Sequence, residues 1–482
     1  MQPDNSEKMN ATPSLIAREE ECLQLQKCIE SNRSEFVIVC GRRRIGKTFL
    51  IDQFFHGNFD FSFVGGHNVE TKVQLRNFAK ALHHYSGAKP KISDWYDAFD
   101  ALEEYLGGLP EDRKKVVFID EMPWIDKQKS DFVSALENFW NAWANRRYDI
   151  LFIASGSATS WMADKLIENQ GGLHNRITAR LYLSPFTLKE TEEYLQGIGF
   201  NDDRLQILQC YMFTGGVPYY LSLLNPQLSI AQNIDELCFH PKGALRKEYD
   251  ELYSALFKNV DAYLSIVRML YEHKAGLTKA EIAKKSMLNG QRLNTVLNNL
   301  EECDFIARRT IFGRKSAGVY RLIDFYTLFY YKFIESNDTL DDNWFTHNLG
   351  SRSVSSWMGL AFELICIQHH KQIKKALGIS GVATSVYTWR CGSTDEHRGG
   401  QIDMLIERAD RVIHLCEMKF SQSTYNIDKD YALALRDRMA LFNQVTKNRK
   451  AVVHTFVTTF GLGEGKHNSI VHSEVTMDDL FE

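Results

Sequence analysis

Several features are scarce in this 482-residue sequence, and each absence excludes a class of protein. No apolar run approaches the length needed to cross a bilayer, so no membrane partner is expected. Residues 1–10 are polar, which is not the pattern of a secretion signal. The nine cysteines include no CxxC pair, which argues against a zinc site and against a disulfide framework. These absences predict a cytoplasmic protein.

An excess of positive charge is also missing. The 57 lysines and arginines are outnumbered by 61 aspartates and glutamates, which gives a formal net charge of −4. Any contact with nucleic acid must therefore come from a local basic patch. The hydrophobic fraction of 44% is that of an ordinary globular protein, and the length suggests about three domains. We expect these domains to span residues 1–226, 227–335 and 350–482.

The clearest pattern is a phosphate-binding loop. An apolar, β-branched run at residues 36–40 predicts a buried parallel strand. It leads into GRRRIGKT, which fits G-x-x-x-x-G-K-[ST] at every fixed position, and an amphipathic helix follows with Phe49, Leu50, Phe54 and Phe55 on one side. Backbone N–H groups of such a loop approach phosphates. The candidate nucleotide-binding residues here are Gly41, Arg42, Arg43, Arg44, Ile45, Gly46, Lys47, Thr48 and Phe49.

A second strand supports this interpretation. The apolar residues 116–119 end in Asp120 and Glu121. Open α/β sheets bind ligands at the carboxyl ends of their strands, so we expect Asp120, with the hydroxyl of Thr48, to hold Mg²⁺. Glu121 is placed to polarise the attacking water in phosphoryl transfer. The two segments together predict an α/β P-loop NTPase with a parallel sheet that binds and hydrolyses ATP with Mg²⁺.

Three further residues are candidates near the nucleotide. A third strand, residues 150–154, ends in SGS. Ser157 of this segment could sense the γ-phosphate, or Ser157 or Thr159 could cap a helix. Arg176 and Arg180 stand just before another strand-like run, and either could act as an arginine finger on a neighbouring subunit of a homo-oligomer. Surface salt bridges are the alternative for both arginines.

The N-terminal part resembles a known group at this point. SLIAREEECLQLQKCI, residues 14–29, resembles the first segment of AAA-type ATPases of the archaeal-ATPase group, with Ala17 in place of their usual glycine. TGGVPYYLSLL, residues 214–224, is similar to their lid segment. The resemblance implies that adenine packs near Ile16 and Arg18.

The same resemblance covers about residues 14–226. It implies that a small helical lid, which includes Pro218, closes over the nucleotide. A pair of core helices would explain the apolar residues of this segment equally well.

The middle of the sequence predicts a winged helix. A capping box at Thr278 and Glu281 opens one helix, and a turn at MLNG leads to a second. Two strands around a loop with Gly313 and Gly318 are expected next. Residues 271–321 contain ten lysines and arginines against five aspartates and glutamates, a local excess that suits a phosphate backbone.

DNA is therefore a candidate partner of this segment. Side chains of the second helix could reach base edges, namely Gln291, Arg292, Asn294 and Thr295. Winged helices also connect domains without touching DNA, and their basic residues are then simply solvated.

Charged residues interrupt two apolar runs near the C-terminus. Side chains 413, 415, 417 and 419 share one face of a strand, so Glu417 and Lys419 continue an apolar row. Asp403 lies in the preceding strand, and a turn over residues 407–411 would set it opposite Leu415 and diagonal to Glu417. Upstream, Glu363 lies within an apolar helix face and needs a partner there.

These residues have a chemical use together. Carboxylates hold Mg²⁺ through oxygen, the metal activates water, and a lysine stabilises the charged transition state. The pattern resembles the core of PD-(D/E)XK nucleases over about residues 351–447, with Gln401-Ile402 where proline precedes the aspartate in the named pattern. The candidate metal ligands are Glu363, Asp403 and Glu417, and the candidate catalytic lysine is Lys419.

A domain of this kind behind an archaeal-type ATPase also resembles a family with an uncharacterised C-terminal domain. The fold class expected for the C-terminal part is therefore α/β and restriction-endonuclease-like. An edge hairpin with solvated charges, or a nuclease fold that no longer cuts, would explain the same residues.

Two functions remain open from the sequence. The first is an ATP-dependent enzyme whose winged helix contacts DNA and whose C-terminal site cuts it. The second is a STAND-like regulatory ATPase switch or scaffold, in which the nuclease-like domain binds but does not cut. Intact Asp403, Glu417 and Lys419 favour the first, and the acidic net charge favours the second.

Overall fold

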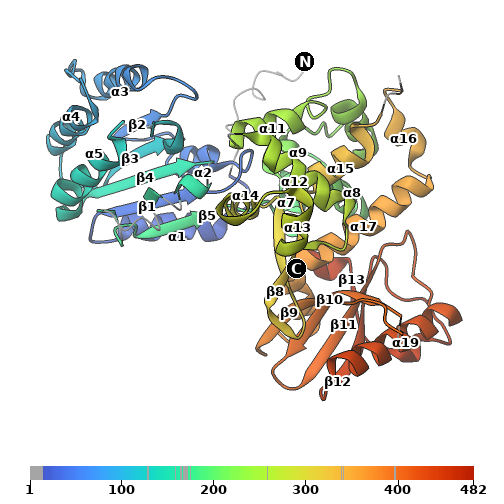
Figure 1. Cartoon of the computed structure of the whole chain (residues 1–482). Coiled ribbons are helices and arrows are strands. Elements are labelled where there is room, and N and C mark those ends of the chain that lie inside the picture. Colours follow the sequence, from blue (N-terminus) through green and yellow to red (C-terminus); the bar gives the residue numbers. More distant parts are fainter. Residues whose placement is uncertain are drawn as a thin grey trace, which may run out of the picture. The chain divides into compact units, whose positions relative to one another are not determined.

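The chain divides into two units, Met1–Ser184 and Pro185–Glu482, which are described separately (Figure 1). The computed structural model describes residues 15–127, 130–157, 159–162, 165–166, 172–173, 175–257, 259–337, 339, 341–395 and 398–482. Among these residues, no helix combines the length and the apolar character that a membrane span requires.

A parallel sheet forms the centre of the first unit. Its strand order is β2-β3-β4-β1-β5. The predicted first, second and third strands are all present, and β1, β3 and β4 are buried along their whole length, as expected for inner strands of a parallel sheet. The strands are β1 (Glu35–Cys40), β2 (Phe61–Val64), β3 (Lys115–Asp120), β4 (Ile150–Gly156) and β5 (Ala179–Tyr182).

Helices cover this sheet. Aromatic side chains of α3, α4 and α5 form a core with β1, β2, β3 and β4, and fully buried Trp95 lies within it. Figure 1 shows α3, α4 and α5 in blue and teal beside the sheet. The helices are α1 (Glu19–Glu30), α2 (Lys47–Phe54), α3 (Thr71–Ser86), α4 (Trp95–Gly107), α5 (Phe132–Asn138) and α6 (Thr159–Met162).

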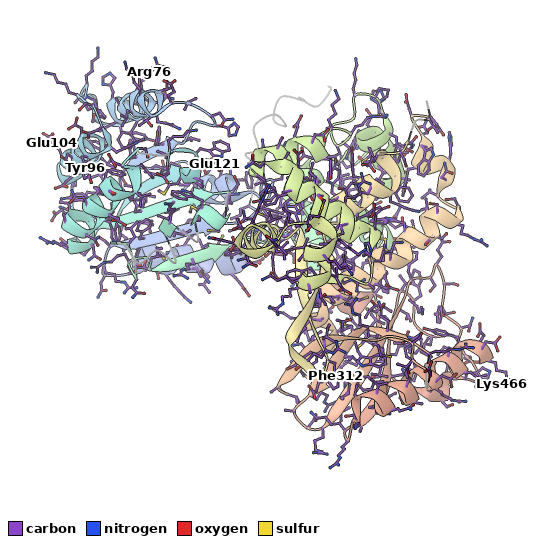
Figure 2. All side chains as sticks on the ribbon, in the orientation of Figure 1. Arg76, Tyr96, Glu104, Glu121, Phe312 and Lys466 are labelled. Carbon is purple, nitrogen blue, oxygen red and sulfur yellow. The ribbon has the colours of Figure 1, made fainter. Side chains whose placement is uncertain are left out.

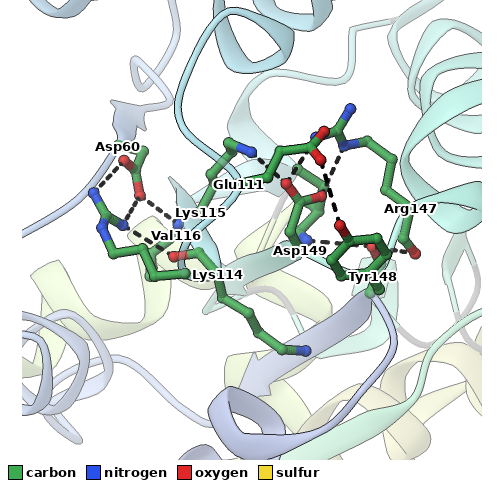
Figure 3. Close-up of polar contacts among 11 residues, drawn as sticks. Asp60, Glu111, Lys114, Lys115, Val116, Arg147, Tyr148 and Asp149 are labelled. Atoms are coloured by element: carbon green, nitrogen blue, oxygen red, sulfur yellow. Dashed lines mark hydrogen bonds and ion pairs between the residues drawn. The ribbon is translucent and has the colours of Figure 1, made fainter.

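A charged network closes the amino ends of β3 and β4 (Figure 3). Lys115 and Asp149 form a buried ion pair, and Arg147 donates two hydrogen bonds of 2.7 Å to the same carboxylate. Burial alone would raise the pKa of Asp149, but its hydrogen bonds with Arg147 and Lys115 lower it to about 2. The charged groups at this end of the sheet are thus paired with one another, which indicates a structural role.

The second unit begins with helices. The aromatic segment after residue 324 packs into this helical part, where Tyr326 is fully buried and donates to Leu245 O at 2.5 Å. The helices before and around it are α7 (Leu188–Gly197), α8 (Arg204–Thr214), α9 (Pro218–Ser222), α10 (Ile230–Ile234), α11 (Glu248–Leu256), α12 (Val260–Glu272), α13 (Lys279–Ser286), α14 (Gly290–Glu302), α15 (Phe325–Phe329) and α16 (Trp344–Asn348).

One mixed sheet runs through the rest of the second unit. In the described residues its order is β13-β12-β11-β10-β9-β7-β8-β6. The helices α17 (Arg352–Gln368), α18 (His370–Ala376) and α19 (Lys429–Thr446) accompany it. The strands are β6 (Leu277–Thr278), β7 (Ile306–Ile311), β8 (Arg314–Leu322), β9 (Thr384–Cys391), β10 (Gly400–Arg408), β11 (Val412–Lys419), β12 (Ala451–Thr458) and β13 (Val471–Thr476).

The predicted capping box is present at the start of α13, where Thr278 and Glu281 bond reciprocally. Two helices and a strand pair follow in the predicted order, and β6 pairs with β8. Gly318, however, lies inside β8 and not in the loop, which is at Gly313 with φ of 77°. The loop needs only one residue with positive φ, so the strand continues through Gly318.

Two other local predictions are wrong. Phe49 is 40% exposed, while the buried side of α2 is formed by Leu50 and Ile51. The β10–β11 turn spans only residues 409–411, and Leu405, not Asp403, stands opposite Leu415. Extending this antiparallel register pairs Asp403 with Glu417. The charged turn residues had suggested a longer loop, but Arg411 adopts a positive φ of 71° that permits a tight turn.

Candidate functional site

The phosphate-binding loop lies between β1 and α2. Gly46 has φ of 88°, a conformation that favours glycine, and it immediately precedes the first residue of α2. Lys47 is buried, and its Nζ donates to Gly41 O at 2.9 Å and to Arg42 O at 3.0 Å. The ammonium group is therefore held against the loop at a helix N-terminus, which is the arrangement that suits phosphate.

Three segments of the first unit meet at Asp120. Thr48 Oγ1 donates to Asp120 Oδ2 at 2.6 Å, and the hydroxyl of Ser155, at the end of β4, donates to Asp120 Oδ1. Magnesium takes only one or two protein oxygens when it is bound together with nucleotide phosphates. A hydroxyl and a carboxylate in contact fit that requirement, so Thr48 and Asp120 are suitable ligands.

Glu121 follows Asp120 in a left-handed conformation with φ of 47°. Its carboxylate accepts from Ser157 Oγ at 2.9 Å and from Ser157 N at 3.3 Å. A Cβ at Gly65 would lie 2.5 Å from Glu121 O, so glycine is needed for this close approach. Figure 2 labels Glu121, which lies after the carboxyl end of β3. Ser157 thus contacts the candidate catalytic carboxylate, a pairing that the sequence did not predict.

The segment expected beside adenine is held by Arg18. This residue is buried and donates to Ser184 O at 2.8 Å and to Ile45 O at 3.4 Å, while Ile16 is half-buried. Ala17 and Arg18 have φ of 61° and 71°. The guanidinium of Arg18 thereby ties residues 15–18 to the phosphate-binding loop.

The remaining nucleotide candidates differ in burial and in the element that carries them. Arg43 and Arg44 are half-buried in the loop, whereas Arg42 and Ile45 are buried. Arg176 and Arg180 are exposed, and Arg180 lies within β5 instead of before it. Pro218 is the first residue of α9 in the second unit.

In the second unit, Asp403 and Glu417 are each paired with an arginine. Arg321 of β8 donates to Asp403 Oδ1 at 3.0 Å. Arg438 of α19 forms an ion pair with Glu417 Oε1, and Tyr431 Oη donates to Glu417 Oε2 at 2.8 Å. Both oxygens of Glu417 therefore already accept hydrogen bonds.

Glu363 and Lys419 complete the predicted group. Burial and then the charge of Asp403 raise the pKa of Glu363 to about 7, although Arg321 and Lys419 act to lower it. Lys419 Nζ lies 4.7 Å from the centre of the Tyr431 ring. The four predicted residues are thus close enough to influence one another, but arginines and a tyrosine stand among them.

Two of the three predicted metal ligands in this group are paired with arginine. In the part of the chain that the structure describes, no three His, Cys, Asp or Glu side chains gather closely enough to hold an ion. The donor oxygens of Glu363, Asp403 and Glu417 suit Mg²⁺ chemically, but two of the carboxylates bind arginine instead. Their assignment as metal ligands remains a prediction.

Sequence reasoning missed the partners of these carboxylates. Tyr431 and Arg438 are seven residues apart on one helix, a spacing that places them on one face and could have been noticed. Arg321 gave no signal, because only the pairing of distant strands brings β8 into the same sheet as β10.

Comparison with known proteins identifies the first part of the chain. Residues 15–224 match a family described as an ATPase domain predominantly from Archaea. An uncharacterized protein of Methanocaldococcus jannaschii, MJECL04, is 24% identical over 400 residues, which are 81% of this chain and 83% of that protein. The chain therefore carries an ATPase domain.

Two solved structures are similar at low identity. The Walker-type ATPase PABY2304 of Pyrococcus abyssi is 16% identical, with a TM-score of 0.46, and the match covers 66% of this chain and 98% of that one. The ORC2 protein of Aeropyrum pernix is 14% identical, with a TM-score of 0.42, and the match covers 75% of this chain and 97% of that one.

Proposed function

We propose that this protein is an ATPase that couples its nucleotide state to the binding or processing of DNA by its second unit. The observation that carries the ATPase part is the 2.6 Å hydrogen bond between Thr48 and Asp120. It joins the phosphate-binding loop to the carboxylate at the end of β3, as metal-assisted phosphoryl transfer requires.

Each residue of the first unit has a role in this proposal. The loop N–H groups and Lys47 hold the ATP phosphates, and Glu121 orients the attacking water. Mg²⁺, held by Thr48 and Asp120, would neutralise phosphate charge. Ser157 orients Glu121 through its two hydrogen bonds. Ile16, Arg18 and Pro218 remain candidates for contact with the base, and Arg176 or Arg180 for contact with a neighbouring subunit.

Two features of the second unit support a DNA partner. The elements from α12 to β8 follow the order of a winged helix, and residues 271–321 carry the local excess of basic residues. The elements from α17 to β12 run two helices, three antiparallel strands, a helix and a strand parallel to β11, an order compatible with a restriction-endonuclease-like core.

The ATPase part is tested by turnover measurements. We expect wild-type protein to release phosphate from ATP, and Lys47→Ala to abolish both nucleotide binding and turnover. A protein that folds but binds no ATP would contradict the proposal.

The DNA part is tested by incubating supercoiled and linear DNA with Mg²⁺ or Mn²⁺, with and without ATP. Cutting that disappears in Glu417→Ala would establish a nuclease, and the response to Lys47→Ala would show whether ATP controls it. DNA binding without cutting would limit the second unit to recognition. If the protein neither binds nor cuts DNA, the DNA role is refuted.

One observation favours a second candidate, a STAND-like regulatory switch or scaffold whose second unit does not cut. Asp403 and Glu417 are neutralised by Arg321 and Arg438. Carboxylates held in this way stabilise a fold without binding metal. This candidate predicts normal ATP turnover and no cleavage with any divalent ion.

A further inference from the structure

The strand pair β7–β8 belongs to the same sheet as the C-terminal strands. Ile311 of β7 pairs with Thr388 of β9, and Phe312 N donates to Thr388 O at 2.8 Å. The ring of Phe312, labelled in Figure 2, lies 5.5 Å from that of Tyr387 and 5.2 Å from that of Phe442. Side chains of the basic middle segment are thus fixed relative to Asp403.

Two arginines share one face of this strand pair. Ala307 pairs with Arg321 and Arg309 pairs with Val319, so Arg309 and Arg321 are diagonal neighbours on the same face. Arg321 forms the ion pair with Asp403. Arg308, between Ala307 and Arg309, points to the opposite face and is exposed.

Arg309 is half-buried, and no hydrogen bond or ion pair to a carboxylate is found for it among the described residues. Burial, and then the charge of Arg321, lower its pKa to about 10, so it is still protonated at neutral pH. His370 of α18 also lies within electrostatic reach of Arg309. A desolvated cation beside another cation is unfavourable unless an anion accompanies it.

We infer that Arg309 and Arg321 bind a phosphate group, and that its source is the phosphodiester backbone of a nucleic acid. A planar guanidinium binds phosphate through parallel hydrogen bonds, and two guanidiniums on one face can share a single phosphate. The position next to Asp403 sets that phosphate beside the predicted C-terminal site. Arg309 is therefore a positioning residue for the substrate. This inference rests on the proposed DNA function and adds the residue that holds the backbone.

Salt-dependent binding tests the inference. A short DNA duplex is titrated with the full-length wild type, Arg309→Gln and Arg308→Gln at several salt concentrations. The two variants lose the same charge from adjacent positions on opposite faces of β7. Arg309→Gln is expected to weaken binding roughly threefold to tenfold, and to reduce the slope of log affinity against log salt by about one. Arg308→Gln removes one charge of the same basic segment from the other face, so it should change the slope and the affinity less than Arg309→Gln does.

A thermal shift with inorganic phosphate separates an anion site from a structural role. Without phosphate, Arg309→Gln should raise the melting temperature because it removes a half-buried charge next to Arg321. Added phosphate should raise the melting temperature of the wild type and leave that of Arg309→Gln unchanged. A lower melting temperature for Arg309→Gln with an unaltered salt slope would show a structural role and overturn the inference.

Two further outcomes distinguish this inference from the proposed function. If DNA binds and Arg309→Gln has the wild-type slope and affinity, the DNA role stands and the arginine site is refuted. If DNA does not bind but the phosphate shift still depends on Arg309, the site takes a free phosphate, and the nucleic-acid source is refuted together with the DNA role.

Discussion

Pairs of carboxylates lie at the candidate sites of both units, but their partners differ. In the first unit, Asp120 and Glu121 accept hydrogen bonds from the hydroxyl groups of Thr48, Ser155 and Ser157. In the second unit, Asp403 and Glu417 accept from guanidinium groups. Hydroxyl donors orient a carboxylate and leave its charge in place, whereas an arginine neutralises it.

As a consequence, the carboxylates of the two sites differ in how easily they can bind a metal ion. Asp120 retains a negative charge beside a neutral ligand, which favours Mg²⁺ bound with a nucleotide. At the second site, Arg321 and Arg438 would compete with a metal ion for the oxygens of Asp403 and Glu417. Similar carboxylate patterns in the sequence therefore lead to two candidate sites whose carboxylates have different partners.

The largest effect is expected at the first site. Glu121→Gln should leave ATP binding intact and lower the turnover rate by about 10²- to 10⁴-fold, because the amide cannot act as a base toward water. Steady-state phosphate release and nucleotide binding measure the two effects. Glu104→Gln, on the exposed side of α4, is the control and should match the wild type. A Glu121→Gln protein with normal turnover would remove this residue from the mechanism.

Acid should act on the two units at different pH. Burial lowers the pKa of His369 to about 4, and its ring accepts from Leu188 N at 3.1 Å in the second unit. In the unfolded chain this histidine is protonated below about pH 6.5. Its contribution to the free energy of unfolding is therefore fully present above pH 6.5 and falls by about 3 kcal/mol as the pH drops to 4. Asp149 in the first unit has its pKa lowered to about 2, so its contribution of about 2 kcal/mol is present above pH 4 and is lost between pH 4 and pH 2.

Unfolding of each unit against pH, followed by hydrogen exchange, measures this separation. His369→Gln keeps an acceptor but cannot titrate, so it should flatten the curve of the second unit between pH 6.5 and 4. The exposed His84→Gln is the matched control. If both units unfolded at the same pH in the wild type and in His369→Gln, His369 would not be the cause of the acid sensitivity of the second unit.

Removing an arginine from the second site should reduce stability by a moderate amount. Arg438→Met leaves Glu417, whose side chain is 8% exposed, without its cation. We expect the free energy of unfolding to fall by about 2 kcal/mol, less than for a fully buried pair because Arg438 is 29% exposed. Chemical denaturation measures the loss, and Arg436→Met on the exposed side of α19 is the control. Partial recovery by Mn²⁺ would show that the freed carboxylate can bind metal.

The smallest effect concerns the segment before α1. Ala17 adopts φ of 61°, where a Cβ is strained. Ala17→Gly should therefore raise the free energy of unfolding by about 0.5 kcal/mol, since relief of strain exceeds the added entropy of the unfolded chain. Ala101→Gly, in the interior of α4, should instead lower it by about 1 kcal/mol. A destabilised Ala17→Gly would show that the methyl group has a packing role.

Local patterns determined much of the first unit. The run before Gly41 and the run before Asp120 each predicted a strand and the chemistry at its end, because motif and element lie in one continuous segment. The same holds for the capping box at Thr278. These features depend on interactions between residues that are close together in the sequence, so they can be predicted without the tertiary structure.

The second site was decided by tertiary structure. The sequence indicated Glu363, Asp403, Glu417 and Lys419, but the register of β10 and β11 depended on a turn whose length could not be read from its charged residues. Arg321 reaches Asp403 only because the β7–β8 pair joins the sheet through β9, which is more than 70 residues away from β7 in the sequence. The partners that set the charge of a carboxylate come from distant segments, and only the packed fold brings them together.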